Sequence, residues 1–186
     1  MYKAYKFRLY PNHTQKELIH KTFGCYRFVY NFFLDKCKIY GYQKAFDMIY
    51  ELKEMYISYP WLKEVDSCSL RCAIFNLEDA YKRFFSKRSG YPTFKSKYKR
   101  QTYRTNCMKS EYKGKRYSSI EIDINSKKIK LPKLGLVDIR GYRNKDSICG
   151  NIINATIIFE ATGKYYVSVI VDEEKKIEEK VKPQSI

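Results

Sequence analysis

The chain has no run of about 18 apolar residues, the length that a membrane-spanning helix needs. Its N-terminus carries Lys3, Lys6 and Arg8 and lacks the apolar core of a signal peptide. These absences argue against a membrane partner and predict a soluble, cytoplasmic protein. The 186 residues, 44% of them apolar, are enough for one domain or two small ones.

Metal-binding and catalytic signatures are also missing. The six cysteines form no C-x-x-C pair, and Cys68 and Cys72, one helical turn apart, lack the second pair that a zinc site needs. Reduced thiols are therefore expected, with no metal and no other cofactor. Only His13 and His20 occur, and no phosphate-binding loop, dinucleotide-binding, zinc-protease or nucleophile-elbow motif is present. The sequence favours a binding module over an enzyme.

Acidic residues are missing from one long stretch. None lies between Asp79 and Glu111, where ten lysines and arginines do, in a chain of net charge +17. Within this stretch GYPTFKSKYKRQTYRT, residues 90–105, interleaves five cations with four aromatic rings. A nucleic acid would neutralise such a block while releasing counterions. A solvated surface would explain the charge alone, but rings beside cations favour nucleic acid.

The first third of the chain predicts a strand followed by a long helix. Residues 2–9 alternate apolar and basic side chains, which is typical of a strand with one buried face. The helix is expected to begin at a capping box of Thr14 and Glu17 and to end at Gly41. Gly24 lies inside it, so either the helix breaks there into a helix-turn-helix or another helix packs closely against it.

Further elements follow from a change of periodicity. Helices are expected at 44–57 and from the caps Asp66 and Ser67 to about Ser89. Strands are then expected near 120–124, 129–131, 136–139, 152–160 and 164–171, the last two as a hairpin. With the first strand they predict an α+β fold, in which a small antiparallel β-barrel has the helices inserted after its first strand.

Six stretches in the right order resemble the OrfB/TnpB family of insertion-sequence proteins: KAYKFRLYPN, GCYRFVYN, WLKEVDS, NLEDAYKRFF, GYPTFKSK with QTYRT, and KLPKLG. The resemblance runs from residue 3 to about 171. It implies a wedge-like barrel domain (1–12 and 106–171), a helical recognition lobe (13–105) with a basic connecting segment (90–105), and a charged linker (172–186).

Intact members of this family are RNA-guided DNA endonucleases related to type V CRISPR effectors. Their RuvC-like nuclease opens with a G-I-D-x-G strand, and this chain ends in KPQSI where that strand would start. The resemblance thus implies that the catalytic carboxylates are absent, and that the chain holds guide RNA and double-stranded DNA without cleavage. The alternatives are a free-standing helix-turn-helix regulator and a non-functional remnant of a transposon gene.

The resemblance also assigns DNA-motif reading to six residues: Tyr42, Ser67, Cys68, Arg71, Met108 and Lys109. Among them, Arg71 has the side chain for a bidentate contact to guanine. The alternative is that Cys68 and Arg71 merely flank the start of a helix.

Contacts to the nucleic-acid backbone are expected from eight cations: Lys6, Arg8, Arg27, Lys95, Lys97, Lys99, Arg100 and Arg104. If the chain is extended, Lys95, Lys97 and Lys99 share one side and track phosphates. Arg27 alternatively ties down the recognition lobe. Tyr98 and Tyr103 either stack on bases or pack onto the barrel, whereas Phe94 is expected to pack.

Overall fold

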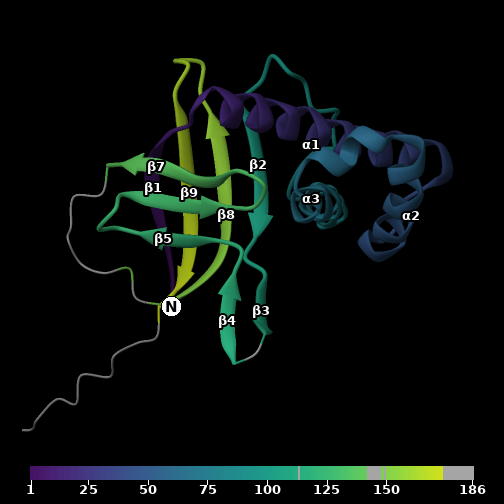
Figure 1. Cartoon of the computed structure of the whole chain (residues 1–186). Coiled ribbons are helices and arrows are strands. Elements are labelled where there is room, and N and C mark those ends of the chain that lie inside the picture. The colour runs from purple at the N-terminus through teal and green to yellow at the C-terminus, as the bar shows by residue number, and fades with distance from the viewer. Residues whose placement is uncertain (113, 142–147, 149, 174–186) are drawn as a thin grey trace, which may run out of the picture.

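The computed structural model describes residues 1–112, 114–141, 148 and 150–173, so the predicted linker lies outside the described residues from position 174 on. Helices stand beside an antiparallel sheet (Figure 1). The helices are α1 (His13–Tyr40), α2 (Ala45–Ser58), the short 3₁₀ helix η1 (Pro60–Glu64) and α3 (Ser67–Phe85). The strands are β1 (Tyr2–Tyr10), β2 (Gln101–Asn106), β3 (Lys109–Tyr112), β4 (Lys115–Ser118), β5 (Glu121–Asp123), β6 (Lys128–Leu131), β7 (Gly135–Arg140), β8 (Asn151–Phe159) and β9 (Tyr165–Asp172).

Helix α1 begins at a different cap from the one predicted. The Asn12 side chain accepts the Gln15 N–H at 2.8 Å, and the Gln15 side chain accepts the Asn12 N–H at 3.0 Å. The Thr14–Glu17 capping box is therefore wrong, because Asn12 has extended backbone and already satisfies the first free N–H groups. The helix runs unbroken through Gly24, and a methyl group there would meet no atom within 4 Å. Neither predicted role of Gly24 is thus found.

Helices α2 and α3 confirm the periodicity read from the sequence. The Asp66 carboxylate accepts the N–H groups of Cys68 and Ser69, at 3.0 and 3.1 Å, and so caps α3. Leu70, Ile74 and Leu77 are fully buried along its apolar face. The helix ends at Phe85, before the predicted end near Ser89. No helix in the described residues is long and apolar enough to cross a membrane.

The sheet has seven strands in the order β2-β8-β9-β1-β7-β6-β5, with β5–β7 running across the front of β1, β8 and β9 (Figure 1). It does not close into the predicted barrel, since β2 and β5 remain its two edges. Beyond the end of β2 and before the start of β5, the Ser119 N–H donates to the Met108 carbonyl at 2.9 Å. Helices α1 and α3 lie against β2, and β2 pairs with β8 alone in the described sheet.

One face of this sheet forms the core together with α1. Tyr5, Phe7 and Leu9 of β1 are buried as predicted. In the antiparallel register they lie opposite Val169, Val167 and Tyr165 of β9. Because side chains alternate along a strand, the intervening Lys6 and Arg8 lie on the other face.

Three contacts between β2 and the helices form the helix–sheet junction. The Thr105 hydroxyl donates to the Asp66 carboxylate at 2.6 Å. The Tyr103 ring meets Phe23 of α1 edge to face, with ring centres 5.4 Å apart. The side-chain amide oxygen of Gln101 accepts from the Arg27 guanidinium at 2.7 Å. Strand β2 therefore belongs to the sheet and at the same time fixes the helices to it.

Replacing Asp66 by Ala should lower the free energy of unfolding by about 1–3 kcal/mol, because α3 loses its cap and the Thr105 hydroxyl loses its acceptor. Chemical denaturation measures this loss. Ser67→Ala, an exposed change in the same helical turn, is the matched control and should have little effect. Equal stabilities of the two variants would contradict the dual role of Asp66.

Candidate nucleic-acid interface

The basic segment before β2 is folded into a turn. The Lys99 N–H donates to the Ser96 carbonyl at 3.4 Å, and the Gln101 side-chain amide donates to the carbonyls of Ser96 and Lys97 at 3.0 and 3.1 Å. The prediction that extended chain aligns Lys95, Lys97 and Lys99 is therefore wrong. The physical reason is that the Gln101 side-chain amide donates to the carbonyls of several nearby residues, and the backbone bends to bring these carbonyls to it.

Lys95 is held against α1 instead of standing free. Its backbone N–H donates to the Asn31 side chain at 2.8 Å, and the Asn31 amide donates back to its carbonyl at 2.9 Å. Its ammonium lies 4.4 Å from the centre of the Tyr30 ring. Burial lowers the pKa of Lys95. This lysine anchors the segment as much as it offers charge.

A groove of about 260 Å³ lies between α1 and the basic segment. We call it the basic groove. Its lining residues include cations, aromatic rings and amides but no carboxylate: Phe23, Tyr26, Arg27, Tyr30, Thr93, Phe94, Lys95, Ser96, Lys99, Arg100, Gln101 and Thr102. An anion entering this groove would meet positive charge that no acid in its walls compensates.

Aromatic rings beside the groove differ in how far they are available to a ligand. Tyr98 is 88% exposed, and the Lys97 ammonium lies 5.1 Å from the centre of its ring. Phe94 is 44% exposed, with the Lys38 ammonium 4.0 Å from its ring centre, so its predicted packing is only partial. Tyr103 is 4% exposed, and burial raises its pKa. Tyr103 therefore packs, and of the two predicted stacking residues only Tyr98 can offer its ring.

Arg27 and Arg104 lie close to the helices. Arg27 makes the junction contact with Gln101 described above, which agrees with its alternative role of tying down the helices. The positive charge of Arg104 counteracts the rise in the pKa of Tyr26 that burial causes. The Nε atom of Arg104 is buried and has no hydrogen-bond partner among the described residues.

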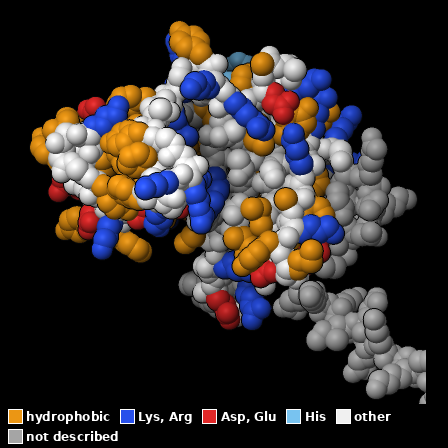
Figure 2. All heavy atoms as spheres, turned by 180° about the vertical axis from the view of Figure 1, so that it is seen from behind, with side chains coloured by type: hydrophobic (Ala, Val, Ile, Leu, Met, Phe, Trp, Pro, Cys, Tyr) orange, Lys and Arg blue, Asp and Glu red, His pale blue; other side chains and the backbone are white. Residues whose placement is uncertain are grey.

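A second basic surface lies on the outer face of the sheet. Arg8 and Arg140 are direct antiparallel partners in β1 and β7, and their guanidiniums lie 4.9 and 5.1 Å from the centre of the same Tyr10 ring. Like charges placed opposite one another are unfavourable unless an anion lies between them. Lys6 is partly compensated, since it pairs with Glu160 at 3.5 Å. Figure 2 shows lysines and arginines over both the helices and the sheet, with acids scattered among them.

The structure brings most of the predicted motif-reading residues to one end of α3. Ser67 is exposed in its first turn, and Arg71 follows one turn later. Cys68 is buried, its thiol donates to the Asn106 carbonyl at 3.8 Å, and a hydrogen bond from Cys72 lowers its pKa. The hydrogen bond between Cys68 and Asn106 brings the start of α3 close to the end of β2. Met108 and Lys109 follow just after β2. Cys68 is therefore better placed to hold this junction than to touch a base.

The side chains of Tyr42 and Lys109, both predicted to read the DNA motif, are already engaged in contacts within the protein. The Tyr42 ring packs against Tyr81 and Phe85, with centres 5.2 and 5.3 Å away. Those residues lie at the far end of α3, about 21 to 27 Å along the helix from Ser67. Tyr42 is thus not part of the group around Ser67. The Lys109 ammonium donates to the Asn151 side chain at 2.7 Å, which holds it towards β8.

Sequence reasoning missed the residues that shape the basic groove. Asn31 and Gln101 position the segment, and Tyr30 supports Lys95. The only signal was a polar Asn31 within a helix whose neighbours are mostly apolar. Such a residue indicates a buried partner but does not identify it, because that partner lies 64 positions away.

Comparisons with known proteins match this chain to one family of sequences. The helix-turn-helix domain of the OrfB proteins matches residues 1–44, which fold here as β1, the single helix α1 and the connection from α1 to α2. InsQ of Escherichia coli (strain K12), which bears the name of an RNA-guided DNA endonuclease, is 29% identical over 92% of this chain and 41% of its own length. A protein of Streptomyces pristinaespiralis with the same kind of name is 36% identical over 52% of the chain and 26% of its own length.

A third relative is matched over nearly its whole length, which corresponds to about half of this chain. The virulence protein VsdF of Salmonella dublin is 30% identical over 53% of the chain and 96% of its own length. By contrast, the chain spans less than half of each of the two relatives named as endonucleases. The matches place the chain among the proteins that insertion sequences encode. Within that class, it belongs to the OrfB/TnpB family.

Replacing Gln101 by Ala should open the turn at residues 96–99, because carbonyls that its amide now holds would lose their donor. The loss of about 1–2 kcal/mol should raise the rate of tryptic cleavage after Lys97, Lys99 or Arg100 by about 5- to 30-fold. Gln43→Ala, which removes a side chain that contacts Glu51 instead, is the control. Unchanged cleavage of the Gln101 variant would show that its amide does not hold the turn.

Proposed function

We propose that this chain binds nucleic acid through the basic groove, and that it holds a guide RNA together with the DNA motif beside its target. The observation that carries the proposal is the groove itself, where Arg27, Lys95, Lys99 and Arg100 surround a space without a carboxylate. Lysines and arginines that release counterions from phosphates supply most of the affinity in such complexes. The exposed ring of Tyr98 adds a face on which a base can stack.

The RNA-guided part of the proposal comes from the relatives. Two of them are named as RNA-guided DNA endonucleases, and one aligns with 92% of this chain. An RNA guide also fits a protein with two separate basic surfaces, because the groove and the outer sheet face around Arg8 can bind different parts of one ribonucleoprotein. We assign the outer face to RNA phosphates and the start of α3 to DNA.

For this chain we propose binding without cleavage. Several acids in the described residues already have structural partners. Asp66 caps α3, Glu78 pairs with Lys82 at 2.6 Å, and Lys36 pairs with Glu51. The hydrogen bond from Lys82 lowers the pKa of Glu78, so its carboxylate stays ionised and paired. These acids maintain the helices and the helix–sheet junction.

Replacing Lys97, Lys99 and Arg100 together by Ala should weaken binding to all sequences. On duplex DNA, the slope of log affinity against log salt should fall by up to about 0.9 for each phosphate that the variant no longer neutralises. Titrations of a structured RNA and a duplex DNA at several salt concentrations measure this slope.

The control replaces Lys44, Lys53 and Lys63, three exposed cations of α2 and its flanks, and removes the same net charge. Equal slopes for the two triple variants would exclude the basic groove from the interface. If the protein bound duplex DNA but ignored structured RNA, the guide-RNA part would fail and a DNA-binding regulator would remain.

Replacing Arg71 by Ala should act on sequence preference instead. The variant should lose about 1–3 kcal/mol on the preferred duplex motif and much less on scrambled duplexes, because a bidentate contact to guanine is made only there. Selection from a randomised duplex library supplies the motif. Arg83→Ala, at the other end of α3, is the control. Equal losses on motif and scrambled DNA would make Arg71 a phosphate contact.

A further inference from the structure

Strands β3 and β4 form a two-stranded ribbon separate from the main sheet, and it projects from the sheet on the side away from α1 (Figure 1). Between this ribbon and the turn that joins β6 to β7 lies an open pocket of about 470 Å³, which we call the ribbon pocket. Its walls are formed chiefly by Met108, Ser110, Tyr117, Ser119, Lys130 and Lys133. The volume is in the range of small-ligand sites, about 300–1,000 Å³.

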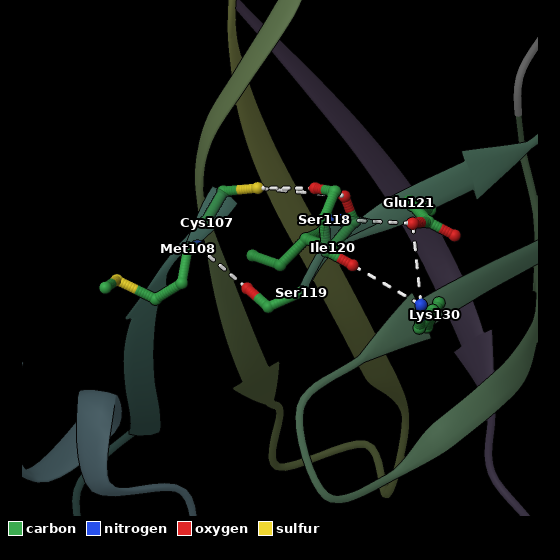
Figure 3. Close-up of polar contacts among 7 residues, drawn as sticks. All are labelled: Cys107, Met108, Ser118, Ser119, Ile120, Glu121 and Lys130. Carbon is green, nitrogen blue, oxygen red and sulfur yellow. Dashed lines mark hydrogen bonds and ion pairs between the residues drawn. The ribbon is translucent and has the colours of Figure 1, made fainter. Parts of the chain in front are cut away.

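The lining of the ribbon pocket combines a flat ring with positive charge. Tyr117 is 48% exposed and Met108 53% exposed, so an apolar ring and a thioether both reach solvent. No carboxylate is among the lining residues. Lys133 stands in the β6–β7 turn with left-handed backbone, at a φ of 63°. Lys130 is steadied by Glu121 at 3.4 Å and by the Ser118 carbonyl at 3.4 Å (Figure 3).

The polar groups of this pocket are fixed before any ligand arrives. The Ser119 hydroxyl oxygen accepts the Met108 N–H at 2.8 Å, and the Ser119 N–H donates to the Met108 carbonyl at 2.9 Å (Figure 3). Because the hydroxyl oxygen serves as an acceptor there, its hydrogen is left to donate into the pocket. The Cys107 thiol and the Ser118 hydroxyl are 2.9 Å apart and hold the base of the ribbon.

We propose that the ribbon pocket holds a single unpaired nucleotide, with its base stacked on Tyr117 beside Met108 and its phosphate on Lys133 and Lys130. The Ser119 hydroxyl then donates to an acceptor on the edge of the base. A base within a duplex has both faces covered by its neighbours and cannot stack on the ring, so only an unpaired base fits. This inference rests on the proposed function and adds to it the place where a flipped or bulged nucleotide is held.

The test uses a short hairpin with one bulged 2-aminopurine and a matched, fully paired hairpin, each made as RNA and as DNA. The full chain should bind a bulged hairpin more tightly than the paired one, and stacking should quench the 2-aminopurine fluorescence. Tyr117→Ala should lose both effects, with affinity for the bulged probe falling by about 5- to 100-fold. Tyr117→Phe should retain them, since it keeps the ring.

Two further variants keep the test decisive. Tyr40→Ala, which removes an exposed ring at the end of α1, should change nothing. Lys133→Ala should weaken binding of the bulged probe while leaving the quenching of the bound state intact. If wild-type protein binds both hairpins equally, or if Tyr117→Ala behaves as wild type, the ribbon pocket is not the site and the proposed function stands. If wild-type protein binds no hairpin, the proposed function fails as well.

Discussion

The Asp66 carboxylate is the contact on which the arrangement of helices and sheet depends. It caps α3 through two backbone N–H groups, and it accepts the hydroxyl of Thr105 from β2. One side chain thus sets where the helix begins and where the edge of the sheet lies against it. The basic groove exists because the chain entering β2 must pass along α1 to reach this junction. The basic groove and the start of α3, the two surfaces proposed to bind nucleic acid, therefore both depend on this structural contact.

The basic segment is ordered without the help of acids. Amide groups of Asn31 and Gln101 hold its backbone, and the rings of Tyr30 and Phe94 lie under lysine ammoniums. Carboxylates in these places could not donate to the carbonyls that the two amides hold, and they would have neutralised the charge of the lysines. Positioning by neutral groups leaves the cations of the groove available for phosphates. The ribbon pocket differs in part: its lining residues include no acid, but Glu121, which is not among them, pairs with Lys130 at 3.4 Å.

Local patterns in the sequence predicted elements better than they predicted how the elements close together. The strand at β1, the three helices and the β8–β9 hairpin follow from periodicity and turn residues, and the structure confirms them. The prediction of a barrel was wrong because β2, an edge strand of the sheet, packs against helices. No local pattern in the sequence reveals this packing. Strands β2, β3 and β4 were missed because their sequences are polar and basic. The turn at Lys97 was missed because the side-chain amide of Gln101 creates it, without the glycine or proline that usually marks a turn.

Hydrogen exchange of the amides in residues 93–101, measured with and without a bound structured RNA or duplex DNA, tests the central claim most directly. If the junction holds these residues as the wall of a nucleic-acid groove, binding should slow their exchange more than that of α2, which lies outside the proposed interface. Protection confined to other elements, with residues 93–101 unchanged in the complex, would contradict the account.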